Sequence, residues 1–171
     1  MKKHERNNTL LALFEHYQPA SALVFCHTKK QCDEPAGFLR EQRIEALAIH
    51  GNLDQRRRDQ VVVQFANNSC PVLVATDVAA RGLDIKSMQA VINYELPREP
   101  EIYVHRIGRT GRAGKKGIAL SIFTESEQAR VNAIEQFQKK PFICDVYESL
   151  DRHPGFTSQS PMVTIQIDAE R

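Results

Sequence analysis

The sequence predicts a three-layer α/β/α fold with a mostly parallel central sheet. Short, continuous apolar runs of strand length alternate with helical segments of about ten residues. Strands that consist of unbroken apolar runs are buried on both faces, as in parallel sheets covered by helices on both sides. The chain has 171 residues, of which 42% are apolar and 26% charged, so it has room for one ordinary soluble domain.

The individual elements follow from apolar spacing and from turn residues. Strands are expected over residues 21–26, 46–49, 72–75, 90–93 and 117–123. Helices are expected over residues 10–17, 28–43, 54–65, 99–107 and 125–137. The first helix should begin after the capping pair Asn8–Thr9 and end before Pro19, and Pro35 should distort the beginning of the second.

The character of the chain changes after residue 150. Residues 151–161 are rich in Pro, Gly and Ser, which is typical of a linker, and residues 162–167 alternate like a strand without a partner. We therefore expect one domain over residues 1–150, and over 151–171 a linker followed by the truncated start of another domain. The alternative is a packed or disordered tail.

Composition excludes several classes of protein. The net charge of +2 means that any basic site must arise locally. The cysteines Cys26, Cys32, Cys70 and Cys144 contain no C-x-x-C pair, so we expect reduced thiols and no metal site, with Cys26 and Cys70 as small buried side chains. Because the chain has no apolar stretch near 18 residues and no signal peptide, we expect a cytoplasmic protein without a membrane span.

Polar clusters follow several of the predicted strands. His27 and Thr28 follow the first, His50 the second, and Thr76 with Asp77 the third. The carboxyl ends of parallel strands meet at one edge of a sheet, where ligands bind in such folds. The polar clusters therefore predict a ligand site at this edge.

The segment 105–112 carries the most specific chemistry. His105, Arg106, Arg109 and Arg112 stand within eight residues that also contain two glycines. A helical turn or tight loop can aim Arg109 and Arg112 the same way, and guanidinium groups suit the charge on a phosphoryl group in transfer. The alternative is a solvated basic helix end. Residues 109–116 nearly form a phosphate loop but lack its first Gly and its final Ser or Thr, so the chain has no Walker A loop.

Two further segments carry polar and charged residues that could belong to a ligand site. Thr76 follows a strand and leads to Arg81, Gly82 and Asp84, although a surface turn with an internal ion pair would explain the same residues. Residues 50–58 form a strand end followed by a helix start, where backbone N–H groups favour phosphate. Gln55 and Arg58 share one face of that helix.

In order and spacing these segments resemble the second-domain motifs of DEAD-box ATP-dependent RNA helicases. Residues 23–28 look like motif IV, Gln55 and Arg58 like motif IVa, residues 75–84 like motif V and residues 105–112 like motif VI. The resemblance covers roughly residues 10 to 140 and implies a C-terminal RecA-like domain. His105 is the most specific element, because neighbouring helicase families usually carry Gln there.

The resemblance also implies roles for individual residues. It implies that Arg109 and Arg112 reach the ATP γ-phosphate, that Asp84 contacts the ribose, and that His105 links to the Asp-Glu-Ala-Asp motif of the N-terminal RecA-like domain. It implies nucleotide contact at Gly82 as well. The residues implied in RNA-backbone binding are Thr28, Gln55, Arg58, Thr76, Arg81 and Gly82. ATP with Mg²⁺ would be held mainly by the other domain, which makes this fragment catalytically incomplete.

The final residues are similar to the approach to the RNA-binding domain of the DbpA-type bacterial branch, which acts on large-subunit ribosomal RNA in ribosome assembly. Two alternatives stay open at this point. One is a DNA helicase or translocase that is also built from two RecA-like domains. His105 argues against this alternative. The other is a free-standing RNA-binding module that has kept the helicase loops.

Overall fold

The computed structural model describes residues 3–50, 54–66, 70–81, 88–110, 117–139, 143–145 and 162–168. Within them the strands form a seven-stranded sheet in the order β2-β3-β1-β4-β5-β7-β6. The strands are β1 (Ala22–Phe25), β2 (Ala46–Ile49), β3 (Val72–Ala75), β4 (Ala90–Asn93), β5 (Gly117–Phe123), β6 (Ile143–Asp145) and β7 (Met162–Asp168). The helices are α1 (Lys3–Tyr17), α2 (Lys29–Glu41), α3 (Gln55–Ala66), α4 (Asp77–Arg81), α5 (Pro100–Ile107), the 3₁₀ turn η1 (Glu125–Glu127) and α6 (Gln128–Gln138).

The sheet from β2 to β5 is parallel, which confirms the predicted fold class. At its carboxyl end Phe25 lies opposite both Ala75 and Asn93, and Asn93 lies opposite Ser121. The residues that follow β1, β3, β4 and β5 therefore meet along one border, which we call the strand-end edge. The chain runs from β3 past β1 to β4, so a topological switch point lies at β1, where ligands bind in open α/β sheets.

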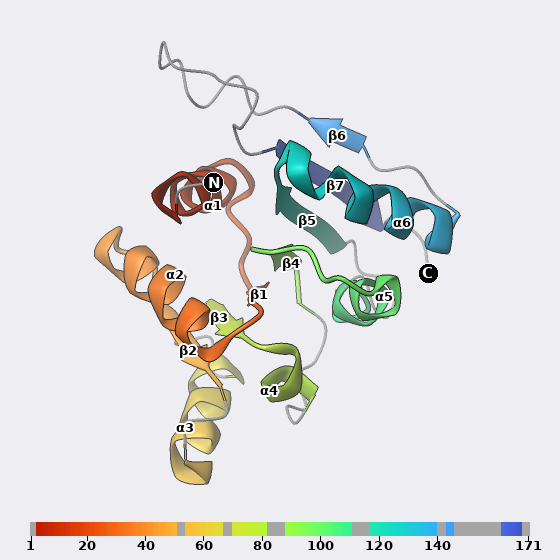
Figure 1. Ribbon diagram of the computed structural model, residues 1–171. Coiled ribbons are helices and arrows are strands. Elements are labelled where there is room, and N and C mark those ends of the chain that lie inside the picture. Colours follow the sequence, from red (N-terminus) through yellow and green to blue (C-terminus); the bar gives the residue numbers. More distant parts are fainter. Residues whose placement is uncertain are drawn as a thin grey trace.

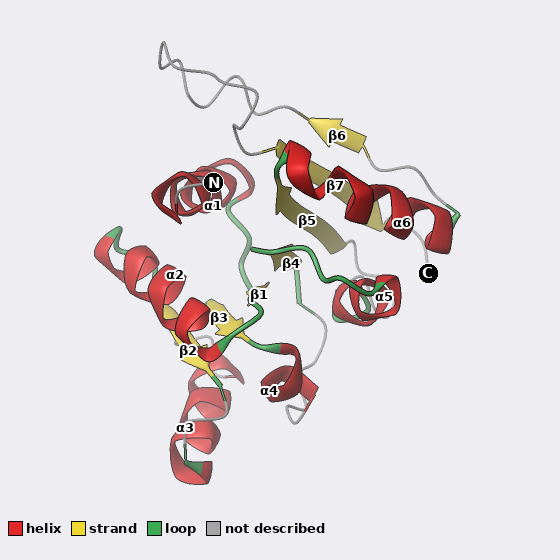
Figure 2. Ribbon diagram, viewed as in Figure 1, coloured by secondary structure: helices red, strands yellow, loops and turns green. Residues whose placement is uncertain are grey.

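Helices cover both faces of the sheet (Figures 1 and 2). Val24 of β1 belongs to a buried cluster with Leu10 of α1 and Leu39 of α2. Its neighbour Leu23 belongs to a different cluster, which contains Ala79 of α4 and is packed by side chains of α3. Successive β1 residues thus serve opposite faces, and this is why the apolar run in the sequence is continuous.

The first helix begins earlier than predicted. α1 starts at Lys3, so the expected start at Asn8–Thr9 is wrong. The Thr9 hydroxyl donates to the Glu5 carbonyl oxygen at 2.9 Å, one turn back, instead of capping an N-terminus. The second helix begins where expected, with Thr28 as its N-cap, and runs through the buried Pro35 to Glu41.

Two short elements were not predicted, and one prediction about a strand is wrong. α4 has 5 residues and β6 has 3, too few for a periodic pattern. The strand predicted over 162–167 is present as β7, but it pairs antiparallel with all of β5, so the expectation that it has no partner is wrong. The division at residue 150 stays a prediction. Among the described residues, no helix has the length and apolarity to cross a bilayer.

Candidate functional site at the strand-end edge

A single buried guanidinium joins the carboxyl ends of the central strands. Arg106, in the last turn of α5, is only 2% exposed. Its Nε and Nη2 donate to the two carboxylate oxygens of Asp77, each at 2.7 Å. Its Nη1 donates to Asn93 Oδ1 at 3.0 Å and to the Glu95 carbonyl oxygen at 2.9 Å. Its guanidinium carbon lies 5.0 Å from the centre of the Phe25 ring. Arg106 therefore fixes α5 to the ends of β1, β3 and β4.

Beside the contacts of Arg106, which we call the Arg106 hub, lies a small pocket lined by cationic side chains. Its volume is about 200 Å³, and its polar lining consists of Arg81, His105 and Arg109 together with Asp77 and Arg106. Arg109 is half-buried, and its Nη2 lies 3.4 Å from the Ala80 carbonyl oxygen, whereas Arg81 and His105 are exposed. The structure thus brings together three of the predicted site residues. Pockets that enclose whole small molecules measure about 300–1,000 Å³, so this one is smaller than a typical ligand pocket.

The predicted RNA residue Thr76 precedes Asp77, which lines this pocket, but Thr76 is not itself a lining residue. It is the last residue before α4, and its hydroxyl accepts from the Ala79 backbone N–H at 3.4 Å. Thr76 is 9% exposed, so little of it is available at the surface. Asp77 follows it, so the turn that carries Thr76 is held by the ion pair with Arg106.

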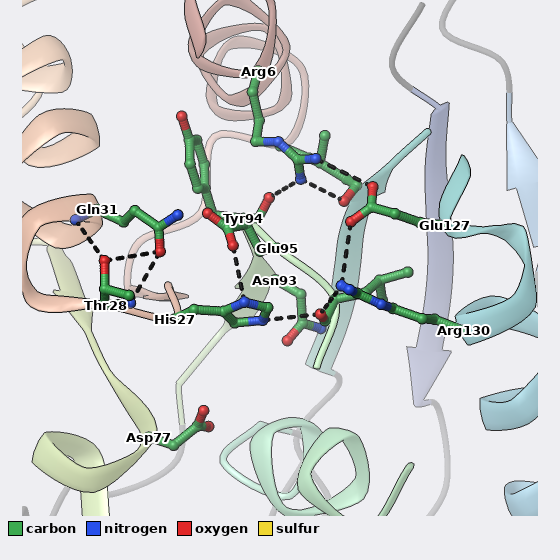
Figure 3. Close-up of polar contacts among 12 residues, drawn as sticks. Arg6, His27, Thr28, Gln31, Asp77, Asn93, Tyr94, Glu95, Glu127 and Arg130 are labelled. Atoms are coloured by element: carbon green, nitrogen blue, oxygen red, sulfur yellow. Dashed lines mark hydrogen bonds and ion pairs between the residues drawn. The ribbon is translucent and has the colours of Figure 1, made fainter. Parts of the chain in front are cut away.

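A larger pocket of about 670 Å³ lies on the other side of the hub, and Thr28 lines it. Thr28 and Gln31 form a capping box at the start of α2: the Thr28 hydroxyl accepts from the Gln31 N–H at 3.3 Å, and the Gln31 side-chain oxygen accepts from the Thr28 N–H at 3.0 Å. Figure 3 shows this box beside His27, whose Nδ1 pairs with Glu95 Oε2 at 3.0 Å.

A polar network on the far wall was not predicted. Arg6 of α1 reaches between β4 and β5 and donates to the Tyr94 carbonyl oxygen and, at 3.0 Å, to that of Ile122. Its Nη2 pairs with Glu127 at 3.2 Å, and Arg130 lies 3.6 Å from the same carboxylate (Figure 3). No motif in the sequence marks Arg6, since all of its acceptors come from distant segments.

Burial and charge shift several pKa values here. Burial by itself would raise the pKa of Glu95, but the hydrogen bond and charge of His27, with the charges of Arg6 and Arg106, lower it below its ordinary value. Burial raises the pKa of the Tyr94 phenol, and it raises that of the Cys26 thiol well above the usual range. Cys26 and Cys70 are buried, as predicted.

Other predicted residues lie elsewhere. Gln55 is exposed on α3 and donates to Asp59 Oδ1 at 2.8 Å, while Arg58 is partly buried, with an Nε that has no hydrogen-bond partner. α3 follows the edge strand β2, so neither residue lines the two pockets around Asp77. The predictions for Gly82, Asp84 and Arg112 lie outside the described residues. Within the part of the chain that the structure describes, no group of three His, Cys, Asp or Glu side chains could hold a metal ion.

Comparisons with known proteins identify the family. The model of the helicase conserved C-terminal domain matches residues 5–114. The chain is 54% identical to the ATP-dependent RNA helicase DbpA of Escherichia coli K12, over 73% of this chain and 27% of that protein. The E. coli DEAD-box protein SrmB, solved in complex with the regulator of ribonuclease activity A, is similar with a TM-score of 0.77 and 31% identity, over 90% of this chain and 92% of that one.

A third similar structure is that of Saccharomyces cerevisiae Dbp5 bound to RNA and ADP-BeF3. Its TM-score is 0.70 and its identity 34%, over 77% of this chain and 36% of that one. The chain spans about a quarter of the length of DbpA, 27%. It belongs to the helicase conserved C-terminal domain family, as a RecA-like domain of the DEAD-box RNA helicase type.

Proposed function

We propose that this domain completes the ATP and RNA sites of an ATP-dependent RNA helicase that opens short duplexes. Arg109 and Arg112 would face the triphosphate, with Mg²⁺ and most nucleotide contacts held by the N-terminal RecA-like domain. The observation that carries the proposal is that Arg81, His105 and Arg109 line one pocket of about 200 Å³ at the strand-end edge. The Dbp5 complex with RNA and ADP-BeF3 supports the assignment of both ligands by similarity.

The chemistry needs little from this domain besides position and charge. Phosphoryl transfer spreads negative charge over the phosphoryl oxygens, and a guanidinium brought across an interface is worth about 10³–10⁵ in rate in such enzymes. Closure of the two domains would bring Arg109 to the phosphate and exclude water. Thr28, Thr76 and Arg81 would contact the RNA backbone rather than its bases, so binding would depend little on sequence.

Arg109→Ala in the intact protein tests the role of Arg109. We expect RNA-stimulated ATP hydrolysis to fall by about 10³-fold or more, while circular dichroism shows a folded protein. Arg43→Ala is the matched control, because Arg43 is exposed just before β2, at the opposite edge of the sheet. Turnover within tenfold of the wild type would contradict the role of Arg109. Equal stimulation by DNA and RNA would favour the DNA-translocase alternative.

We further propose that the RNA target is large-subunit ribosomal RNA and that the activity serves ribosome assembly. Support comes from the 54% identity to DbpA and from the resemblance of residues 151–171 to the approach to an additional RNA-binding domain. The test compares the affinity of the intact protein for a hairpin of large-subunit ribosomal RNA with that for a scrambled hairpin. Equal affinities would contradict the proposal.

A further inference from the structure

The strand β7 lies between two strands that run in the same direction. β5 and β6 are each antiparallel to β7, so they are parallel to each other, and within the described residues they do not pair directly (Figure 1). They follow each other in the chain and are joined by η1 and α6. Parallel strands joined by a helical crossover are usually neighbours in the sheet, as β4 and β5 are here with α5 between them. β7 therefore occupies the place at which β6 is expected to pair.

The registers of the three strands would allow β6 to take the place of β7. Ser121 of β5 lies opposite Thr164 of β7, and Thr164 lies opposite Cys144 of β6. The three residues form one row across the sheet, so Cys144 is two strand spacings from Ser121, roughly 10 Å. A sideways step of one spacing, about 4.8 Å, would bring Cys144 next to Ser121. Because this step keeps the register, no residue of β6 would change the face of the sheet to which it belongs.

The two arrangements differ in the number of paired residues. β7 forms seven register pairs with β5 and three with β6, whereas β6 alone would form three with β5. Insertion of β7 is therefore favoured until another strand pairs with β7 elsewhere. Residues 146–161 separate β6 from β7 and are rich in Pro, Gly and Ser, the composition of a linker. Such a connection would let β7 leave the sheet while the elements before it stay in place.

We propose that the edge of β5 that faces away from β4 is a strand-docking site with two alternative occupants, β7 and β6. Met162–Asp168 is then an inserted strand that can be released, and β6 pairs with β5 when it leaves. In the docked state Asp168 lies opposite Gly117, so the chain that follows β7 leaves the sheet at the start of β5. The competing partner of β7 is the sheet of the additional RNA-binding domain, and this part of the inference rests on the proposed function.

Disulfide cross-linking can report both states, because Cys144 already supplies one thiol. A disulfide needs Cα atoms about 4.4–6.8 Å apart. Thr164→Cys places a second thiol opposite Cys144, so it should form a bridge only while β7 is docked. Ser121→Cys should form a bridge to Cys144 only when β6 pairs with β5. Oxidised glutathione accepts the two electrons, and mass spectrometry identifies the bridged peptides.

Ile165→Pro shifts the balance in the 171-residue chain, since proline removes a ladder hydrogen bond from the inserted strand. With it, bridging of Thr164→Cys to Cys144 should slow by about tenfold or more, and bridging of Ser121→Cys to Cys144 should accelerate by about as much. Gln159→Pro is the matched control, because it lies in the linker before β7 and should change neither rate. Equal bridging of Ser121→Cys with and without Ile165→Pro would overturn the proposal, and so would a failure of Thr164→Cys to bridge.

Hydrogen exchange gives a second measurement that leaves Ser121 unchanged. In Ile165→Pro, amide protection of β5 should fall at residues 117–119 and persist at residues 120–122, which β6 would cover. Loss of protection along the whole of β5 would mean that β6 does not replace β7. Neither measurement reads RNA-stimulated hydrolysis, so failure of the proposed function would leave both results unchanged.

The competing partner is tested in the intact protein. There Ser121→Cys should bridge to Cys144 without Ile165→Pro, since the downstream domain holds β7. Bridging as slow as in the 171-residue chain would overturn this partner.

Discussion

His27 joins two strand ends through its imidazole: Nδ1 lies 3.0 Å from Glu95 Oε2, and Nε2 lies 2.9 Å from the Leu96 carbonyl oxygen. A protonated imidazole can donate to both acceptors at once. The loop after β1, which leads to Thr28, is thereby tied to the segment after β4. The side chain of Glu95 is only 16% exposed, so its charge depends on these neighbours.

Glu95→Gln should lower stability at neutral pH and flatten its dependence on pH. The pKa of Glu95 in the folded protein is lowered, so its contribution is present above its ordinary value of 4.5 and is lost as the pH falls through the folded pKa. We expect a loss of about 1–3 kcal/mol at pH 7, as for hydrogen bonds between charged groups. Urea unfolding of both proteins from pH 7 down to pH 3.5 measures this. A gap that stays constant over that range would contradict the assignment.

Arg6→Lys should destabilise the attachment of α1. The guanidinium of Arg6 donates to the carbonyl oxygens of Tyr94 and Ile122 and pairs with Glu127, and a single ammonium group cannot reach all of them. We expect a loss of about 1–3 kcal/mol in the free energy of unfolding, measured by urea titration. The control is Arg56→Lys, at an exposed position of α3. Equal, small effects in both variants would show that the contacts of Arg6 add nothing to stability.

Much of the fold was predictable because the sheet is parallel. β1, β3 and β4 are buried at every position, which leaves a continuous apolar run that the sequence displays directly. The first turns of α1 were not predicted, and Arg6, which lies in them, makes its contacts with distant segments. The acceptors of Arg6 stand 88, 116 and 121 residues away, and no local pattern encodes such contacts.

The sequence predicted three of the residues that line the small pocket, Arg81, His105 and Arg109, but not which basic side chain of the 105–109 segment is buried. His105, Arg106 and Arg109 look alike as a basic cluster, yet only Arg106 is buried. Helix phase is the signal that could have separated them, because Tyr103, Arg106 and Ile107 are spaced as one helix face and the other two members are apolar. An arginine on an apolar face needs a buried partner, and Asp77 supplies it.

This chain by itself should bind ATP weakly. The pocket that Arg109 lines has a volume of about 200 Å³, smaller than a typical ligand pocket, and the proposed function assigns most nucleotide contacts to the N-terminal domain. We expect a Kd in the millimolar range, about −4 kcal/mol at most, by titration calorimetry. Micromolar binding by the chain alone would contradict a site shared between two domains.

Thr28 has two predicted roles that three variants can separate. Thr28→Ala removes the N-cap of α2 and should cost about 1 kcal/mol of stability, whereas Thr28→Ser should keep it. Gln31→Ala removes the other half of the capping box but leaves the Thr28 hydroxyl in place.

If the hydroxyl itself contacts the RNA backbone, Thr28→Ala should weaken RNA binding by the intact protein several-fold in fluorescence anisotropy, while Thr28→Ser and Gln31→Ala should bind as the wild type does. The reason is that a phosphate contact needs the donor, not the order of the helix end. Equal weakening in Thr28→Ala and Gln31→Ala would mean that the ordered start of α2, through its backbone N–H groups, carries the contact instead.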